Sequence, residues 1–220
     1  MKLASLGRLT ANIAHEIRNP LSAINHAAEL LIEDSTHSAG EMRLLQIIHD
    51  NTQRLDRMVQ DVLRLNRRDR ALRETFNVAD YLRVFVGQFA EIEKVAGNVI
   101  RIDAEIEPEV TFDRSHLNQI MWNLCRNALR YCRKQTGSIV LSVRKTAPAG
   151  SIELSVRDDG PGVADALKAN LFEPFFTTAS SGTGLGLYIA REICEANGAR
   201  LEYVDGTNGG AQFSVLFKGA

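Results

Sequence analysis

The chain has 220 residues, of which 45% are hydrophobic and 24% are charged. This length suits two small domains, and this composition is ordinary for a globular protein. The formal net charge of −1 produces no strong field toward nucleic acid or lipid, so direct nucleic-acid binding is not expected. The three cysteines have no paired spacing, which favours reduced thiols.

No run of about 18 apolar residues occurs, so no part of the sequence is expected to span a membrane. The first residue leads almost directly into a helix that carries a motif. We therefore expect a fragment of a longer protein, with contact to a membrane only through a segment upstream of this sequence.

The first 70 residues have the pattern of two long helices. Apolar residues recur at helical spacing, at Leu3, Leu6, Leu9, Ile13, Ile17, Leu21, Ile24, Ala28 and Leu31, and again at Leu44, Ile48, Leu55, Val59, Val62 and Leu65. The polar stretch 33–40 would join the helices as an antiparallel hairpin. A lone hairpin leaves its apolar stripes half exposed, so we expect a homodimer in which two hairpins form a four-helix bundle. Packing of the hairpin on the rest of its own chain is the alternative.

From Phe76 onward, short helices and strands alternate. Helices are expected over 77–97 with Asn77 as N-cap, over 114–132 with Asp113 as N-cap, and over 184–197. Strands are expected over 99–106, 109–112, 138–145, 151–157, 199–204 and 211–217. The first two would flank a Glu107–Pro108 turn, and most strands would be linked as hairpins. This order predicts an α+β sandwich, preceded by a basic linker over 64–73.

His15 lies opposite the apolar seam of the first helix. At 100° per residue it is about 200° from Ile13 and about 160° from Ile17, so its side chain should point into water. Glu16 can accept a hydrogen bond from one ring nitrogen, which would leave the other nitrogen as a nucleophile. Asn19 lies one turn along the same face. An ordinary solvated helix face is the alternative.

A second cluster lies on the predicted helix over 114–132. Asn123 and Asn127 are four residues apart, so both amides project from one helix face. Amide oxygens at this spacing suit a Mg²⁺ ion and phosphate groups. A polar helix face is the alternative, and Arg126 and Arg130 could equally be solvent charges.

Two glycine-rich segments and an aromatic segment follow. The segment 158–162 (DDGPG) ends a predicted strand, where a carboxylate can accept a hydrogen bond from an exocyclic amine such as that of adenine. The segment 182–187 (GTGLGL) leads into a helix, where backbone N–H groups can meet phosphates. The aromatic segment 172–178 (FEPFFTT) suggests a mobile lid. Taken singly, the segment 158–162 also fits a common turn. The aromatic segment also fits a loop whose phenylalanines pack into the core.

The order of these patterns along the chain resembles that of the motifs in the sensor histidine kinases of bacterial two-component systems. Residues 14–24 (AHEIRNPLSAI) are similar to the H box, 123–131 to the N box, 158–162 and 182–187 to the two glycine boxes, and 172–176 to the F box. Order and spacing match over essentially the whole chain. The short lid and the continuation Tyr188-Ile189-Ala190 are similar to the nitrogen-regulation and type IV pilus sensor kinases.

The resemblance implies a dimerisation and phosphoacceptor domain over 1–70. It also implies a catalytic domain over 71–220 with the α/β-sandwich fold of the gyrase, Hsp90, histidine kinase and MutL ATPases. The chain would then be an ATP-dependent protein-histidine kinase with ATP and Mg²⁺ as cofactors. It would autophosphorylate and pass the phosphoryl group to an Asp of a response regulator receiver domain, and it could also dephosphorylate that regulator. Because the ATPase domain would have to swing toward His15, the linker near 67–75 should act as a hinge.

Individual roles follow from the same resemblance. His15 would be the phosphoacceptor, Glu16 would help to activate it, and Asn19 would position a water in the phosphatase reaction. Asn127 would coordinate Mg²⁺. The expected nucleotide-binding residues are Asn123, Asn127, Arg130, Tyr131, Asp158, Gly160, Gly162, Thr183, Gly184, Leu185, Gly186 and Leu187.

The chain departs from the family pattern at a few positions. Ala179 stands where relatives with short lids often carry Lys, and Ala211 stands where relatives often carry a polar residue behind the adenine site. The loss of a lid cation would weaken phosphate contacts.

Other functions stay open at this point. An ATP-gated clamp of the same nucleotide-binding class would explain the nucleotide motifs but not the residues around His15. A non-catalytic dimeric scaffold would explain the hairpin but not the nucleotide motifs, and an enzyme that works mainly as a phosphatase is a further alternative.

A kinase of this type needs a neutral imidazole as its nucleophile. The rate of autophosphorylation should therefore decrease when the pH falls below about 6.

Overall fold

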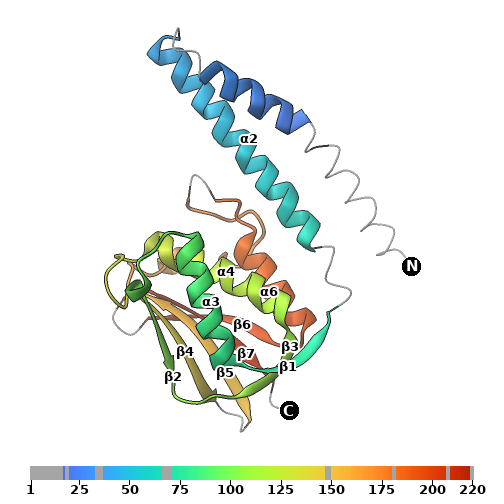
Figure 1. Ribbon diagram of the computed structural model, residues 1–220, viewed down its shortest axis with the longest axis vertical. Coiled ribbons are helices and arrows are strands. Elements are labelled where there is room, and N and C mark those ends of the chain that lie inside the picture. Colours follow the sequence, from blue (N-terminus) through green and yellow to red (C-terminus); the bar gives the residue numbers. More distant parts are fainter. Residues whose placement is uncertain are drawn as a thin grey trace, which may run out of the picture. The chain divides into compact units, whose positions relative to one another are not determined.

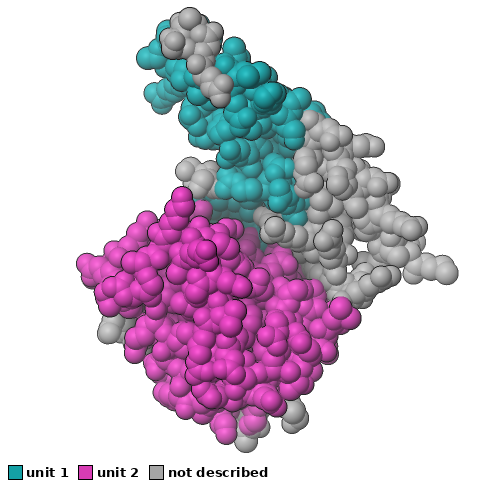
Figure 2. Space-filling view, in the orientation of Figure 1, with its two compact units in different colours: residues 1–70, 173–185 teal, residues 71–172, 186–220 magenta. Residues whose placement is uncertain are grey.

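The computed structural model (Figure 1) describes residues 17, 20–32, 37–65, 71–146, 150–179, 182–206 and 209–218, without the side chains of 61–65. It forms two compact units, residues 1–70 with 173–185 and residues 71–172 with 186–220 (Figure 2). In the part of the chain that the structure describes, no helix is long and apolar enough to cross a membrane.

The first unit contains the predicted helical hairpin. Residues 20–32 are helical, and α2 spans Ala39–Leu65. A capping box begins α2: the Glu41 N–H donates to Ser38 Oγ (3.4 Å), and the Ser38 N–H donates to Glu41 Oε2 (2.8 Å). The helix starts here because both terminal N–H groups gain acceptors from within the same turn.

Much of the hairpin's apolar surface is exposed in a single chain. The exposed side chains, between 43% and 62% accessible, include Ile24, Leu31, Leu44, Ile48 and Leu55. They recur at helical spacing and therefore form stripes, which four-helix bundles bury. This exposure supports the expected pairing with a second hairpin.

The second unit contains two sheets. The five-stranded sheet has the order β2-β4-β5-β7-β6, with strands Ile100–Ala104 (β2), Ile139–Thr146 (β4), Ser151–Asp158 (β5), Ala211–Phe217 (β7) and Arg200–Asp205 (β6). Strand β2 runs parallel to β4, and all other neighbours are antiparallel. The smaller sheet pairs β1 (Arg73–Asn77) with β3 (Glu109–Asp113) in antiparallel orientation.

Three helices cover one face of the five-stranded sheet (Figure 1). They are α3 (Val78–Ile92), α4 (Arg114–Tyr131) and α6 (Gly186–Ala196); the unit also has a 3₁₀ turn, η2 (Gly97–Val99), and the short α5 (Asp165–Lys168). Leu141, Leu154 and Val215 of neighbouring strands have no accessible surface. Apolar alternation along the strands thus builds one core between sheet and helices. The predicted α+β sandwich is confirmed.

The predicted N-caps Asn77 and Asp113 are confirmed, whereas the helix expected from 184 begins at Gly186. Asn77 Oδ1 accepts the Asp80 N–H (3.1 Å) at the start of α3. Helix α3 ends at Ile92 rather than near Gly97, because Lys94 adopts a left-handed φ of 53° and the Val95 N–H turns back to the Ala90 carbonyl (3.0 Å).

Two predictions about strands were wrong. The strands on either side of Glu107–Pro108 do not form a hairpin, because β2 pairs with β4 whereas β3 pairs with β1. Residues 73–75, expected in the linker, belong to β1 instead. The Leu72 N–H donates to Asp113 Oδ2 (2.7 Å), and Arg73 donates to the Ala196 carbonyl (2.9 Å). A hinge in the linker is therefore expected before Leu72.

The N-cap of α4 generates a stability prediction. Burial raises the pKa of Asp113, but hydrogen bonds from Ser115, from the His116 N–H and from the Leu72 N–H outweigh it and hold the pKa below its usual value. These bonds stabilise the folded state fully above the ordinary Asp pKa of about 4, and this stabilisation is lost as the pH falls through the lowered folded pKa.

We expect Asp113→Ala to lower the free energy of unfolding by about 1–2 kcal/mol at pH 7. The loss should shrink as the pH falls from about 5 to about 2, because the carboxylate is then protonated in the native chain. Urea unfolding at several pH values measures both quantities. A loss that is the same across this pH range would contradict the assignment.

Candidate functional site

The last residue of β5, Asp158, is a buried carboxylate with only 7% of its surface accessible. Its Oδ1 accepts the N–H groups of Gly160 (2.9 Å) and Ala211 (3.3 Å). Both bonds use the same oxygen, and among the described residues no hydrogen bond to Oδ2 is found. The carboxylate is therefore held in one orientation while its second oxygen can accept a donor from a ligand.

Burial raises the pKa of Asp158, and the nearby Asp159 acts in the same direction, while the two N–H donors oppose the shift. An additional donor from a ligand would stabilise the charged form of this carboxylate.

Two glycines allow the backbone to crowd around Asp158. A Cβ on Gly160 would lie 2.6 Å from the Tyr131 carbonyl oxygen and 2.8 Å from Asp158 Oδ1. Gly210 has a φ of 83°, and a Cβ there would lie 2.0 Å from the Asp158 carbonyl oxygen. Both contacts are shorter than any side chain can tolerate, so these positions require glycine.

Helix α4 contributes the two predicted amides. Asn123 Nδ2 donates to the Gly186 carbonyl (3.1 Å), which fixes the first turn of α6 against α4. Asn127 follows one turn later and is half-buried, whereas Arg130 and Tyr131 at the end of α4 are exposed. Asn123 therefore positions α6 here, and the structure brings Asn127 and Asn123 onto one face of α4.

The residues of the second glycine segment divide between two regions. Gly186 and Leu187 form the first turn of α6, where backbone N–H groups without helical partners suit phosphate oxygens. Thr183, Gly184 and Leu185 belong to the segment 173–185 of the first unit.

Within that segment, the F-box and glycine-box residues lie against each other. Gly184 has a φ of 72°, and a Cβ there would lie 2.3 Å from the Phe175 backbone carbon. Thr183 Oγ1 accepts the Leu185 N–H (3.3 Å). Residues of the two sequence boxes thus pack against each other.

The predicted residues His15, Glu16 and Asn19 lie outside the described residues. Gly162, in contrast, is described: it has a φ of 74°, and a Cβ there would lie 2.9 Å from the Gly210 carbonyl oxygen. The first glycine box therefore packs against the turn that precedes β7.

Sequence reasoning missed Asp159 and Gly210 as parts of this site, and it noted Ala211 only for its side chain behind the adenine site. Asp159 was visible as the second carboxylate of the DDGPG segment, and Gly210 as one of a Gly-Gly pair before a strand. The role of the Ala211 N–H could not be predicted, because a backbone N–H is present whatever the side chain of the residue is.

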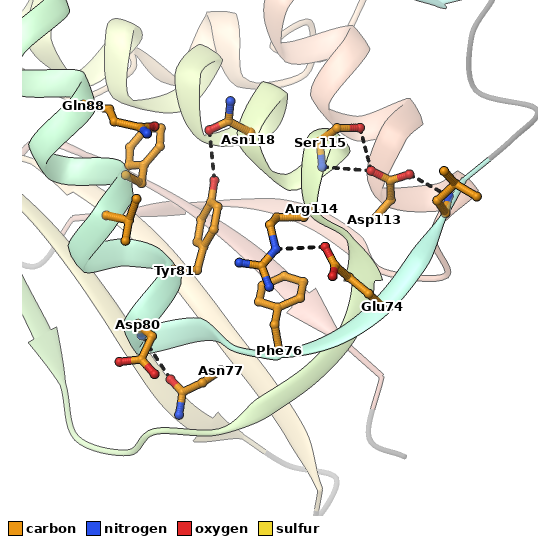
Figure 3. A pocket seen from close by; sticks show the side chains of 13 residues that line it. Glu74, Phe76, Asn77, Asp80, Tyr81, Gln88, Asp113, Arg114, Ser115 and Asn118 are labelled. Carbon is orange, nitrogen blue, oxygen red and sulfur yellow. Dashed lines mark hydrogen bonds and ion pairs between the residues drawn. The ribbon is translucent and has the colours of Figure 1, made fainter.

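A separate cavity of about 800 Å³ lies between β1, α3 and the start of α4 (Figure 3). Its polar side chains already bind one another: Arg114 donates to Glu74 (2.8 Å), Tyr81 donates to Asn118 (3.5 Å), and Asp113 caps α4. A ligand there would compete with these bonds, whereas Asp158 offers a free oxygen. The end of β5 is therefore the better candidate site.

Two family models match the chain. The His Kinase A (phospho-acceptor) domain, HisKA, matches residues 5–71, and HATPase_c, the histidine kinase-, DNA gyrase B- and HSP90-like ATPase, matches residues 112–220. Fold and site thus define the second unit as an ATP-binding domain of this ATPase class.

Individual relatives agree with the two domain matches. The sensor protein kinase PilS of Pseudomonas aeruginosa is 44% identical over 99% of this chain and 41% of its own length. The sensor histidine kinase ZraS of Escherichia coli K12 is 31% identical over 97% of this chain and 46% of its own length. The crystal structure of full-length ShkA in complex with AMPPNP has a TM-score of 0.69 and 26% identity, over 97% of this chain and 46% of that one.

The chain belongs to the sensor histidine kinases, as its sequence motifs predicted. It spans less than half the length of PilS and of ZraS.

The neighbouring glycines before β7 provide a matched test of the site's geometry. Gly209 and Gly210 both have positive φ, but a Cβ on Gly209 would meet nothing closer than 3.8 Å. We expect Gly209→Ala to cost about 1 kcal/mol of unfolding free energy through backbone strain alone. Gly210→Ala should cost about 2–4 kcal/mol, since it also forces apart the ends of β5 and β7. Equal losses in urea unfolding would contradict the close approach at Asp158.

Proposed function

We propose that this chain is the core of a sensor histidine kinase that transfers the γ-phosphoryl group of ATP to His15. The phosphoryl group then passes to an Asp in the receiver domain of a response regulator. The proposed domains are residues 1–70 for dimerisation and phosphate acceptance and residues 71–220 for ATP binding. A phosphatase reaction on the same regulator, with Asn19 positioning water, completes the proposal.

The buried and oriented Asp158 carboxylate is the observation that carries the nucleotide part of this proposal. Its open Oδ2 suits the 6-amino group of adenine, and the first turn of α6, fixed by Asn123, suits the phosphates. Gly160 and Gly162 let the backbone segments around Asp158 approach one another closely, and Gly186 and Leu187 supply N–H donors. Arg130 and Tyr131, exposed at the end of α4, are proposed to contact phosphate and nucleotide.

The lid residues Thr183, Gly184 and Leu185 are proposed to close on the phosphates. Gly184 tolerates the left-handed φ that its packing on Phe175 requires. Closure of such a lid excludes water from phosphoryl transfer. The lid carries Ala179 where short-lid relatives often have Lys, so its contribution comes from backbone donors.

The residues present fit a Mg²⁺ ion. Asn127 offers a neutral amide oxygen on the same face of α4 as Asn123, and Mg²⁺ prefers oxygen ligands with few protein contributions. When bound, the ion would neutralise charge on the phosphates. Asn127 would hold the ion, and the α6 N–H groups would orient the phosphates.

In the transfer itself, a neutral imidazole nitrogen of His15 attacks the γ-phosphorus, the bond to the β–γ bridging oxygen breaks, and ADP leaves. Glu16 is proposed to bind the other ring nitrogen and thereby select the tautomer. Positioning and charge stabilisation supply most of the catalysis in such transfers.

We also propose a homodimer, because the exposed stripe that includes Ile24, Leu44 and Leu55 needs a partner of the same shape. The proposed location is the cytoplasm, where ATP and response regulators occur. Any attachment to a membrane would come from a segment upstream of this sequence.

Incubation with γ-labelled ATP and Mg²⁺ tests the kinase proposal. The native chain should acquire acid-labile, base-stable label, and both His15→Gln and Asn127→Ala should reduce it to background. His15→Gln should still bind ATP, since His15 accepts the phosphoryl group and is not part of the nucleotide pocket.

Label that persists in His15→Gln would place the acceptor on another residue. ATP binding without any label would favour a scaffold or a clamp instead. Transfer of label to a receiver domain, and its removal by the native chain but not by Asn19→Ala, tests the two remaining steps.

A further inference from the structure

Asp159, the residue after the proposed adenine ligand, binds a different part of the chain. Its Oδ1 accepts the Arg133 N–H (2.9 Å), and its Oδ2 accepts the Ser138 hydroxyl (2.8 Å). Its own N–H donates to the Ser138 carbonyl (3.1 Å). One residue at the end of β5 thus makes three hydrogen bonds to the loop that joins α4 to β4.

These bonds hold the carboxylate in its charged form. Burial raises the pKa of Asp159, but the Arg133 N–H and the Ser138 hydroxyl outweigh it and lower the pKa below its usual value. At neutral pH both bonds are therefore charge-assisted, which makes them stronger than bonds between neutral groups.

The loop that Asp159 holds is short and contains unfavourable backbone conformations. Lys134 has a φ of 58° although it is not glycine, and Gly137 has a φ of 72°. The Gln135 N–H donates to Ser138 Oγ (2.8 Å), so the hydroxyl that binds Asp159 also closes the loop on itself. On its far side the loop is held by η2, since the Gly137 N–H donates to the Asn98 carbonyl (2.8 Å) and Asn98 Nδ2 donates to Thr136 Oγ1 (3.0 Å). Asp159 holds the side of the loop that lies next to α4.

The same loop fixes the end of α4 against the end of β5. Gly160 lies so close to the Tyr131 carbonyl that no Cβ fits between them. Arg133, whose N–H Asp159 accepts, follows Tyr131 by two residues. Asp159 therefore holds the backbone that follows Tyr131 beside the end of β5.

We propose that Asp159 is a positioning residue for the nucleotide: it locks the end of α4 to the end of β5, so that Asp158 and the α4 side chains meet the same ligand. The inference rests on the proposed function, namely that a nucleotide binds at the end of β5. Asp159 acts through the α4–β4 loop and does not itself contact the base or the phosphates.

Asp113 provides a matched control for a purely structural role. It is also a carboxylate with a lowered pKa that accepts backbone N–H groups of α4, but it does so at the opposite end of the helix. Helix α4 has 18 residues, which separates its two ends by about 27 Å. Loss of Asp113 should destabilise the fold without changing the nucleotide site.

The experiment is a titration of the native 220-residue chain and its variants with a fluorescent N-methylanthraniloyl ADP in the presence of Mg²⁺, at a temperature where all variants are folded. Asp159→Ala should raise the Kd about tenfold, because Asn127 and Arg130 of α4 are then no longer held in position relative to Asp158. Asp159→Asn should lie between Asp159→Ala and the native chain, since its amide oxygen can still accept the Arg133 N–H. Asp113→Ala should leave the Kd unchanged.

A double-mutant cycle identifies the bond through which Asp159 acts. Ser138→Ala should also raise the Kd. In the double variant, the Kd should rise by less than the product of the two single fold-changes, because both substitutions break the same hydrogen bond. Autophosphorylation at saturating ATP should be less affected by Asp159→Ala than autophosphorylation at low ATP.

Each outcome bears on a separate claim. Native-like ADP binding by Asp159→Ala, or an equal loss of affinity in Asp113→Ala, would overturn the positioning role while leaving the nucleotide site intact. A native chain that binds no ADP would contradict the proposed function, and the positioning role with it.

Discussion

Helix α4 is fixed at both ends by carboxylates that follow strands of two different sheets. At its N-terminus Asp113, the last residue of β3, accepts the N–H groups of Ser115 and His116. Just beyond its C-terminus, Asp159, which follows β5, accepts the Arg133 N–H. The Asp113 bonds cap the first turn of α4, whereas the Asp159 bond holds the residues after its last turn beside the end of β5. The side chains along α4 therefore have a defined direction relative to the end of β5.

Helix α6 depends on α4 in the same way. Asn123 of α4 binds the Gly186 carbonyl in the first turn of α6. After the last turn of α6, the buried Asn197 accepts the Asp113 N–H (3.3 Å) and shares a hydrogen bond with His116 (2.9 Å). The half-buried amide of Asn123 and the buried amide of Asn197 thus tie α6 to α4 near both of its ends. Sites whose groups are held by such supporting bonds can bind a ligand with little reorganisation.

The sequence predicted those strands and helix starts that depend on residues close together in the chain. Alternation identified β4 and β5, and side-chain acceptors at Asn77 and Asp113 identified two helix starts. Strand β1 was missed because Phe76 is its one buried residue, and the pairing of β2 with β4 was missed because a strand and a helix intervene in the chain. In the site, Asp158 was predictable from its glycine-rich motif. The close approach of Gly210 was not, because two segments distant in sequence meet there through backbone atoms.

The central claim is that the free oxygen of the oriented Asp158 carboxylate selects an exocyclic amine. Competition between ATP and purine riboside triphosphate, which lacks the 6-amino group, for the chain in the presence of Mg²⁺ tests it most directly. The structure predicts that the native chain binds ATP at least about tenfold more tightly, and that Asp158→Ala removes most of this difference. Equal affinity of the native chain for the two nucleotides would contradict the account.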